Sequence, residues 1–371
     1  MIGLYSPELP PVPGGVADHT LALARALEAE GAAPAVLGRE GDPTVFAPLT
    51  CRTGLGPTDL PRAARELRLT ALVVQYVPFA FARRGIAPRL CLGIRRLAGA
   101  GLVIAVVLHE PFVPFTRLPW LVTGWPMRWQ LRDVLRRTAF VYAPVPRYAE
   151  IARAYAPRAA VRLAPVGATL PVSPAGRAEA RAALGLPDGA VAVGVFSPAA
   201  AGFRRDWIEE AAARLAAARA RDGAPAPTVV WVVFGNGAER VLAAPPAGVT
   251  VRRVTERDAA AIGRTMRALD LAVAPYVDGL TMRRTGAMLA LAHAVATVSS
   301  TGPLYDSRLG ELAACEPTAP ALAARLDALI RDPAARAALA AKAAGYRELA
   351  SVEVLARHIV ADLAGPTRNV T

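Results

Sequence analysis

The 371-residue sequence is poor in lysine, histidine and cysteine. Lys342 is the only lysine, so the other basic residues behind the net charge of +13 are arginines. The three cysteines are odd in number and far apart, without metal-ligand spacing, which indicates reduced thiols, as in a cytoplasmic protein. No uncharged apolar run reaches the roughly 18 residues of a membrane-spanning helix. The amino terminus also lacks the basic region of a signal peptide.

The order of apolar segments predicts an α/β protein. At about 150 residues per domain, the length indicates two domains. Short apolar runs alternate with helical patterns over short connections, which favours a doubly wound parallel sheet in each domain. We expect domains at 1–170 and 190–350, a linker at 171–189 and a C-terminal helix or tail at 351–371. The expected strands are 1–6, 33–37, 71–76, 102–108, 190–196, 229–234, 249–254 and 271–274, and the expected helices are 17–30, 177–184, 207–218, 287–296 and a helical region from 319 onward.

The stretch 271–296 predicts an anion site. A short apolar strand leads into Asp278-Gly279, and Arg283-Arg284 then precede the apolar run 287–296, which we expect to be a helix. The first N–H groups of a helix lack partners and its dipole favours negative charge, while arginine offers forked donors to phosphate. A solvated arginine pair in a loop is the alternative. The predicted phosphate or diphosphate site comprises Asp278, Gly279, Leu280, Thr281, Arg283, Arg284 and Thr285.

Two other loops have similar features. Arg204 and Arg205 lie in a small-residue loop between an expected strand and an expected helix, which indicates a second phosphate contact. After the first strand, Gly14-Gly15 lets a ligand approach the backbone closely, or forms a plain turn. This loop lacks the G-x-G-x-x-G spacing, so we do not expect NAD. Asp18 and His19 follow in the first helical turn, either as caps or as ligand contacts.

His109 and Glu110 follow the expected strand 102–108. Ligands of open α/β sheets bind at the carboxyl ends of strands, so this position favours a function as a base, a donor to sugar hydroxyls or an orienting pair. A purely structural histidine is the alternative.

Residues 112–137 combine aromatic and basic side chains, and the first half of the chain is the more basic half. Residues 1–170 hold 20 arginines and 11 acidic residues, against 23 basic and 19 acidic residues in 171–371. The pattern indicates an acceptor cleft or a membrane-touching edge, or else a core-packed helix with arginines that extend to solvent. The residues are Phe112, Phe115, Trp120, Trp125 and Trp129 with Arg117, Arg128, Arg132, Arg136 and Arg137.

Taken together, these motifs resemble the GT-B glycosyltransferases, specifically the large retaining family that includes sucrose synthases and bacterial mannosyltransferases. The segment 275–285 is similar to the Asp-Gly-x-Ser-x-Arg-Arg variant of that family's donor loop. Gly14-Gly15 is similar to its first-loop glycine motif, and His109 falls at its sugar-contacting histidine. Arg204 or Arg205 falls at its basic diphosphate position. Phe234, Gly235, Asn236 and Gly237 resemble its nucleoside-binding G-x-G segment.

The sequence departs from the commoner family pattern of two glutamates. Asp278 stands at the first glutamate, near the sugar, and Leu289 stands at the second, on the ribose. Ala294-Val295-Ala296 replaces a small-Gly-x-Pro segment. The resemblance therefore implies either a different mode of ribose binding or an unusual nucleotide, with arginine in place of a diphosphate-binding lysine.

The resemblance implies two Rossmann-like domains that face a cleft and transfer a sugar from a nucleotide-diphosphate-sugar to a hydroxylated acceptor, with retention and without metal or another cofactor. His109 and Asp278 would be catalytic, and Asp18, His19, Glu110, Trp120 and Trp125 would lie on the acceptor side. A small molecule, a lipid-linked compound or a glycan would be the acceptor, in bacterial glycan or natural-product biosynthesis. We expect no nucleic-acid partner, and a cytoplasmic protein with peripheral contact at the inner membrane face. A nucleotide-sugar epimerase and a non-catalytic binding protein on the same fold are the alternatives.

Overall fold

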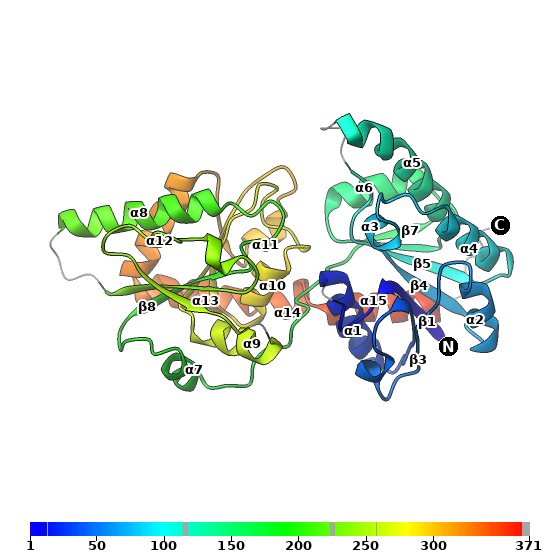
Figure 1. The fold of residues 1–371 in the computed structure, drawn as a ribbon, viewed down its shortest axis with the longest axis horizontal. Coiled ribbons are helices and arrows are strands. Elements are labelled where there is room, and N and C mark those ends of the chain that lie inside the picture. The colour runs from blue at the N-terminus through cyan, green and yellow to red at the C-terminus, as the bar shows by residue number, and fades with distance from the viewer. Residues whose placement is uncertain (13, 114–117, 223–226, 257, 366–371) are drawn as a thin grey trace. The chain divides into compact units, whose positions relative to one another are not determined.

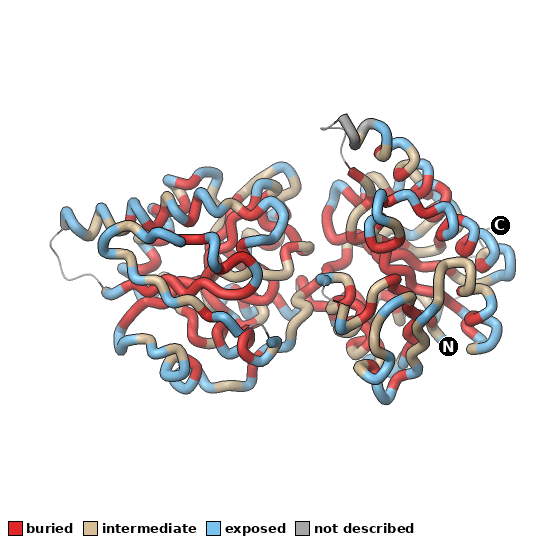
Figure 2. The backbone as a smooth tube through the Cα atoms, in the orientation of Figure 1, coloured by how far each residue is buried: buried red, intermediate tan, exposed pale blue. Residues whose placement is uncertain are grey.

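The computed structural model describes residues 1–371 except residues 13, 114–117, 223–226, 257 and 366–371. The chain divides into two compact units (Figure 1), and each is described by itself. Unit 1 comprises Met1–Thr169 with Ala350–Thr371, and unit 2 comprises Leu170–Leu349. In both units the buried residues concentrate along the strands (Figure 2).

Unit 1 contains a seven-stranded parallel sheet in the order β3-β2-β1-β4-β5-β6-β7. Its central strands are largely apolar, as expected where helices cover both faces of a parallel sheet. Helices α1 and α15 pack in the core on one face, and α2, α4, α5 and α6 pack in the core on the other. The strands are β1 (Ile2–Glu8), β2 (Ala35–Glu40), β3 (Cys51–Arg52), β4 (Ala71–Tyr76), β5 (Val103–Leu108), β6 (Phe140–Ala143) and β7 (Ala160–Leu163). The helices are α1 (Gly15–Ala29), η1 (Pro43–Phe46), α2 (Leu60–Glu66), α3 (Pro78–Phe81), α4 (Pro88–Gly99), α5 (Leu118–Leu135), α6 (Pro146–Tyr155) and α15 (Val352–Ala364).

The last helix returns to unit 1. Leu355 and Ile359 of α15 are fully buried in the same core as α1. The Asp362 carboxylate accepts hydrogen bonds from the Tyr142 hydroxyl at 3.0 Å and from Arg162 Nε at 2.7 Å. The C-terminal helix is therefore an integral part of the first sheet's core.

Unit 2 contains a six-stranded parallel sheet in the order β10-β9-β8-β11-β12-β13. The strands are β8 (Val191–Phe196), β9 (Val229–Phe234), β10 (Thr250–Val254), β11 (Leu271–Ala274), β12 (Ala296–Ser300) and β13 (Ala314–Glu316). The helices are α7 (Arg177–Ala183), α8 (Arg205–Asp222), η2 (Ala238–Arg240), α9 (Ala259–Ala268), α10 (Thr285–Ala292), α11 (Ser307–Gly310), α12 (Ala319–Arg331), α13 (Pro333–Ala343) and α14 (Tyr346–Leu349). The two parallel sheets confirm the predicted fold class, and strands β4, β9 and β11 match their predicted bounds.

The predicted helix 287–296 is wrong at its C-terminal end. Helix α10 ends at Ala292, and Ala294 adopts a left-handed φ of 54° that turns the chain. Ala296 then begins β12, which pairs in parallel with β11 and β13. A continuous apolar run does not distinguish a buried helix from a buried strand by its periodicity, so the sequence did not reveal the turn.

Each sheet has one topological switch point, where the strand order reverses. In unit 1 it lies between β1 and β4, and in unit 2 it lies between β8 and β11. Loops that follow neighbouring strands on either side of a switch point diverge and leave room for ligands at the carboxyl edge. Within the described residues, no helix has both the length and the apolar character needed to cross a lipid bilayer.

Candidate functional site at two strand-end loop clusters

The loop after β11 is held in place by backbone hydrogen bonds to the loop after β12. The Leu280 N–H donates to the Ser300 carbonyl at 2.9 Å, and the Leu304 N–H donates to the Asp278 carbonyl at 3.0 Å. Gly279 and Gly302 let the two backbones approach closely, because a Cβ on Gly302 would lie 2.5 Å from the Gly279 nitrogen. The Gly279 N–H donates to the Tyr276 carbonyl at 3.1 Å. The N–H groups of Gly279 and Leu280 are thus both used within the protein, and other donors must meet any anion.

Arg284 joins this loop to the loop after β8. It is 8% exposed, and its Nη2 forms an ion pair with Asp278. Its Nη1 donates to the Ala201 carbonyl at 2.7 Å, and its guanidinium carbon lies 4.4 Å from the centre of the Tyr276 ring. Burial raises the pKa of that tyrosine to about 12, so the phenol stays neutral under the cation. Two of the three guanidinium nitrogens are thereby used to fix the loops.

The loops after β8 and β11 also bond to each other directly. The Val277 N–H donates to the Gly202 carbonyl at 2.8 Å, and the Arg204 N–H donates to the Pro275 carbonyl at 2.9 Å. A Cβ on Gly202, which has a φ of 75°, would lie 3.2 Å from Arg284 Nη2. The two loops that flank the switch point of unit 2 therefore form one connected surface around Arg284.

Four hydrogen-bond donors in this cluster have no acceptor in the described part of the chain. Two belong to buried side chains, Arg284 Nε and Thr281 Oγ1. The other two are the backbone N–H groups of Gly286 and Ala287 in the first turn of α10. A buried donor without a partner costs about 1–3 kcal/mol, so native structures rarely keep several together unless a ligand or water pairs them. The helix dipole adds positive potential at the same turn, which favours an anion.

Arg204 and Arg205, next to this cluster, differ in their ion pairing. Arg204 pairs with Asp206 through Nε at 3.0 Å and Nη2 at 2.6 Å, and this hydrogen bonding lowers the pKa of the carboxyl. Arg205 is exposed and has no ion pair within the described residues. Arg283 is partly exposed at the loop itself. Arg205, rather than Arg204, thus has a side chain without an acidic partner.

The predicted nucleoside segment lies after β9, beside the loop after β8. The Ala199 N–H donates to the Asn236 carbonyl at 2.9 Å, and a Cβ on Gly237 would lie 2.8 Å from the Ala199 nitrogen. Asn236 is exposed, whereas the Phe234 ring is fully buried with its centre 5.0 Å from that of Phe196. The Phe234 side chain therefore belongs to the core, and only the rest of the segment can face a ligand.

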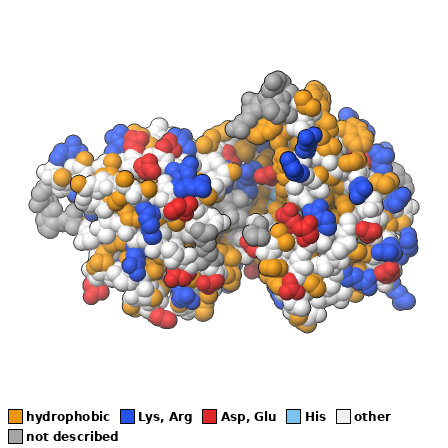
Figure 3. All heavy atoms as spheres, viewed as in Figure 1, with side chains coloured by type: hydrophobic (Ala, Val, Ile, Leu, Met, Phe, Trp, Pro, Cys, Tyr) orange, Lys and Arg blue, Asp and Glu red, His pale blue; other side chains and the backbone are white. Residues whose placement is uncertain are grey.

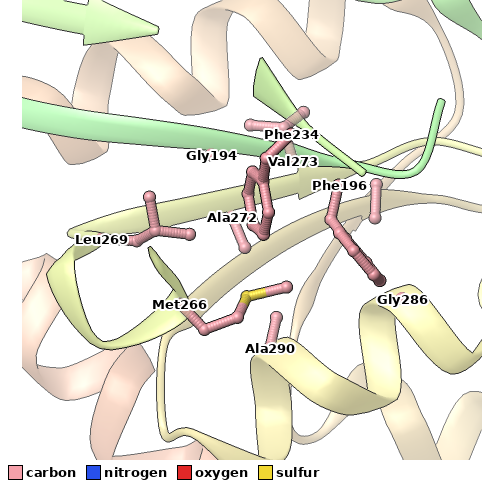
Figure 4. A pocket seen from close by; sticks show the side chains of 10 residues that line it. Gly194, Phe196, Phe234, Met266, Leu269, Ala272, Val273, Gly286 and Ala290 are labelled. Atoms are coloured by element: carbon pink, nitrogen blue, oxygen red, sulfur yellow. The ribbon is translucent and has the colours of Figure 1, made fainter. Parts of the chain in front are cut away.

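A small cavity lies beneath this loop cluster, between the sheet and helices α9 and α10 (Figure 4). It holds only about 10 Å³ and is lined by apolar groups such as Phe196, Met266 and Ala290. A water molecule needs about 10–15 Å³ and polar partners, so this cavity is a packing gap and not a ligand site.

In unit 1 the structure brings together two histidines that are far apart in the sequence. His109 follows β5, and its Nε2 lies 2.5 Å from Oε1 of Gln75 in β4. The fully buried His19 of α1 places its ring perpendicular to that of His109, with the centres 4.7 Å apart. Burial lowers the pKa of His19 to about 4.

Asp18, beside His19, is half-buried, and burial raises its pKa. Gly14 and Gly15 are exposed ahead of these residues, with open space around the Cβ position of Gly15.

The predicted acceptor-side tryptophans lie on α5. Trp125 is exposed and Trp120 is partly exposed, while Met127 and Leu131 on the same helix are fully buried. Glu110 is partly exposed next to His109. Phe112 lies beneath the Arg128 guanidinium at 3.9 Å. Phe115 and Arg117 fall outside the described residues.

Comparison with known proteins places this architecture among solved structures. No protein-family model and no curated protein sequence matches the chain. A sucrose-phosphate synthase from Thermosynechococcus elongatus has a TM-score of 0.64 at 18% identity, covering 97% of each chain. A glycosyltransferase from Rickettsia africae has a TM-score of 0.67 at 10% identity, covering 98% of this chain and 97% of that one. WaaG, a glycosyltransferase involved in lipopolysaccharide biosynthesis, has a TM-score of 0.63 at 12% identity, covering 99% of this chain and 100% of that one.

The protein has the GT-B glycosyltransferase fold. At these identities the likeness shows the fold alone, and the site residues of this GT-B protein rest on its own geometry. Tyr276 lay within the predicted segment 275–285 without a role of its own, and sequence reasoning missed Gln75 and Ser300. Gln75 is a polar residue inside an otherwise apolar strand. Ser300 ends β12, and its Oγ accepts from the Tyr276 N–H at 2.7 Å.

Proposed function

We propose that this GT-B protein is a retaining, metal-independent glycosyltransferase that moves a sugar from a nucleotide-diphosphate-sugar to a hydroxylated acceptor. One observation carries the proposal, namely the four unpartnered donors at the unit 2 switch point, with Arg205 and Arg283 beside them. These donors match the oxygens of a diphosphate. The likeness of the fold to structures whose names describe glycosyltransferases supports the same function.

In the proposed reaction, negative charge grows on the departing diphosphate. Arg284 Nε, the Thr281 hydroxyl and the first N–H groups of α10 are already oriented, so they stabilise that charge without reorganising. Arg205 adds a mobile cation at the surface. Because arginines and backbone N–H groups supply the positive potential, the diphosphate needs no divalent metal.

The two predicted catalytic residues have distinct roles in this proposal. Asp278 uses Oδ1 to hold Arg284, which leaves Oδ2 to accept a hydrogen bond from a hydroxyl of the donor sugar. His109 contacts the transferred sugar, and Gln75 sets the orientation of its ring. His19 packs against that ring in its neutral form and excludes water from it.

A non-catalytic nucleotide-binding protein is the second candidate. It is favoured by Leu289, which is buried at the position where the resemblance expects a ribose-binding glutamate. A binding protein would retain the diphosphate site and lose turnover. Incubation with a panel of nucleotide sugars, with release of free nucleoside diphosphate as the readout, separates the two candidates.

Thermal stabilisation by nucleoside diphosphates and nucleotide sugars tests the site itself. A ligand at 100 times its Kd adds about 2.7 kcal/mol to the free energy of unfolding. We expect one nucleotide to stabilise the protein equally with and without EDTA. Arg205→Ala should weaken this effect, whereas Arg214→Ala, an exposed change on the same helix α8, should not. The absence of a shift with every nucleotide would overturn the proposal.

A further inference from the structure

Helix α5 in unit 1 exposes a row of large apolar side chains. Val122, Trp125 and Trp129 are 75%, 69% and 58% exposed, respectively. Their spacing of three and four residues puts them on one face of the helix. On the opposite side, Met127, Leu131, Val134 and Leu135 are fully buried, the last three in a core that includes strand residues of the sheet. The helix therefore has a second apolar face that the fold of unit 1 does not cover.

The same face continues into basic residues at the C-terminal end of α5. Arg132 and Arg136 follow Trp129 at helical spacing and are exposed, and neither has an ion pair within the described residues. They line a surface pocket of about 340 Å³ together with Tyr155 and Arg158 from the end of α6. None of the residues that line this pocket is acidic. The pocket thus combines three guanidinium groups with an aromatic ring.

Favourable charge at the end of the helix does not account for this arrangement. Cations in a last turn offset the helix dipole, which explains Arg132 and Arg136 separately. It does not explain the exposed tryptophans upstream.

Neighbouring elements extend the apolar and basic character. Phe79, Ile86 and Leu92 on or next to α3 and α4 are also exposed, so six of the nine exposed large hydrophobic residues in the described chain lie between 79 and 129. Residues 79–137 contain ten arginines and two acidic residues. One of those, Asp133, is buried and paired with Arg95 and Arg137. Figure 3 shows hydrophobic and basic side chains gathered over this part of unit 1.

This surface is separate from the candidate functional site. The pocket is formed where α5 leads into β6 and α6 leads into β7, which is the amino edge of the sheet. His109 lies at the carboxyl edge, after β5. A ligand in the pocket would therefore occupy the opposite edge of the sheet from the predicted sugar site.

We propose that the outer face of α5 and the arginine pocket form a binding site for an anionic membrane lipid. The headgroup phosphate binds Arg132, Arg136 and Arg158, and the adjoining hydrocarbon lies along Trp129, Trp125 and Val122. Tryptophan and arginine suit the headgroup region of a bilayer, because the tryptophan ring lies at that level and the guanidinium pairs with phosphate. The site anchors the protein on the bilayer surface and does not depend on the proposed transferase activity.

Vesicle co-sedimentation tests the proposal with the full chain. We expect binding to equimolar phosphatidylglycerol–phosphatidylcholine vesicles, weak binding to pure phosphatidylcholine, and release by salt. Arg132→Gln with Arg136→Gln should weaken binding by about thirtyfold, which is roughly fivefold for each arginine. Trp125→Ser with Trp129→Ser should reduce it to the level of neutral vesicles.

The matched control is Arg214→Gln with Arg240→Gln, which removes two exposed arginines from unit 2 and should leave vesicle binding unchanged. Circular dichroism and melting temperature establish that each variant folds. Equal binding to both kinds of vesicle, or full binding by the arginine variant, would overturn the proposal. A third outcome would also overturn it. If the protein bound no vesicles but inorganic phosphate stabilised it through these arginines, the pocket would be a site for a free anion.

Discussion

Arg284 is buried and forms an ion pair with Asp278 inside the loop after β11, and its Nη1 links that loop to the loop after β8 through the Ala201 carbonyl. Both residues were expected to contact ligand directly. In the structure, each has part of its hydrogen-bonding capacity used within the protein, so their proposed ligand contacts are made by the remaining atoms, Arg284 Nε and Asp278 Oδ2.

Asp278→Asn should destabilise the protein strongly. The substitution leaves the Arg284 charge buried without its anion, and loss of one partner of a buried pair costs about 3–5 kcal/mol. Asp206→Asn is the matched control, because it breaks the exposed pair with Arg204 and should cost less than about 1 kcal/mol. Urea unfolding measures both. Equal losses would show that the Arg284–Asp278 pair is no more important than a surface pair.

Gly302→Ala should shift the donor loop. Its Cβ would lie 2.5 Å from both the Asp278 carbonyl carbon and the Gly279 nitrogen, and these backbone atoms cannot rotate away. Strain of this kind typically costs about 1–3 kcal/mol, and we expect nucleotide stabilisation to be lost with it. Gly176→Ala, where no atom lies within 4 Å, is the control. Thermal melting with and without nucleotide measures both effects. Equal melting temperatures and equal nucleotide stabilisation of the two variants would contradict the prediction.

Stability should fall in mild acid because of His19. Burial lowers its pKa in the folded protein from 6.5 to about 4. Between these two pKa values the unfolded chain binds more protons than the folded protein does. The contribution of neutral His19 to the free energy of unfolding is therefore complete above pH 6.5, and it declines by up to about 3 kcal/mol as the pH falls to about 4. His19→Gln should flatten that part of the profile. The difference between the two profiles isolates His19 from the other histidines, and identical slopes would refute the assignment.

Gln75→Glu should raise the pKa of His109. The wild-type amide oxygen lies 2.5 Å from His109 Nε2, so a carboxylate in the same place stabilises the imidazolium. Titration of the imidazole signals by NMR measures the shift, with His358 of α15 as an internal reference. An unchanged His109 pKa would mean that Gln75 does not set the electrostatics of the ring. When the His109 pKa rises, the acidic limb of the pH profile of transfer activity should also move to higher pH.

Local patterns predicted much of the fold, and several of the candidate site residues that they named lie together in the structure. Strands β4, β9 and β11 were located to the residue, because fully buried parallel strands are short apolar runs bounded by turns. The same signal failed at Ala292–Ala296, where one apolar run contains a helix end, a left-handed turn and a strand. Asp278 and Arg284 were both named as candidates, but their pairing was not predicted, because side-chain partners depend on the path of the loop.

The sequence by itself determined the two α/β units, the residue types at the strand ends and the concentration of arginine and tryptophan in residues 112–137. These are local properties, fixed by hydrophobic periodicity and by composition. Only the tertiary structure decided that His19 meets His109, that Ala201 accepts from Arg284 and that α5 turns its tryptophans outward. Those relationships join residues from different strands and helices, and they arise because parallel strands bring distant segments to one edge of a sheet.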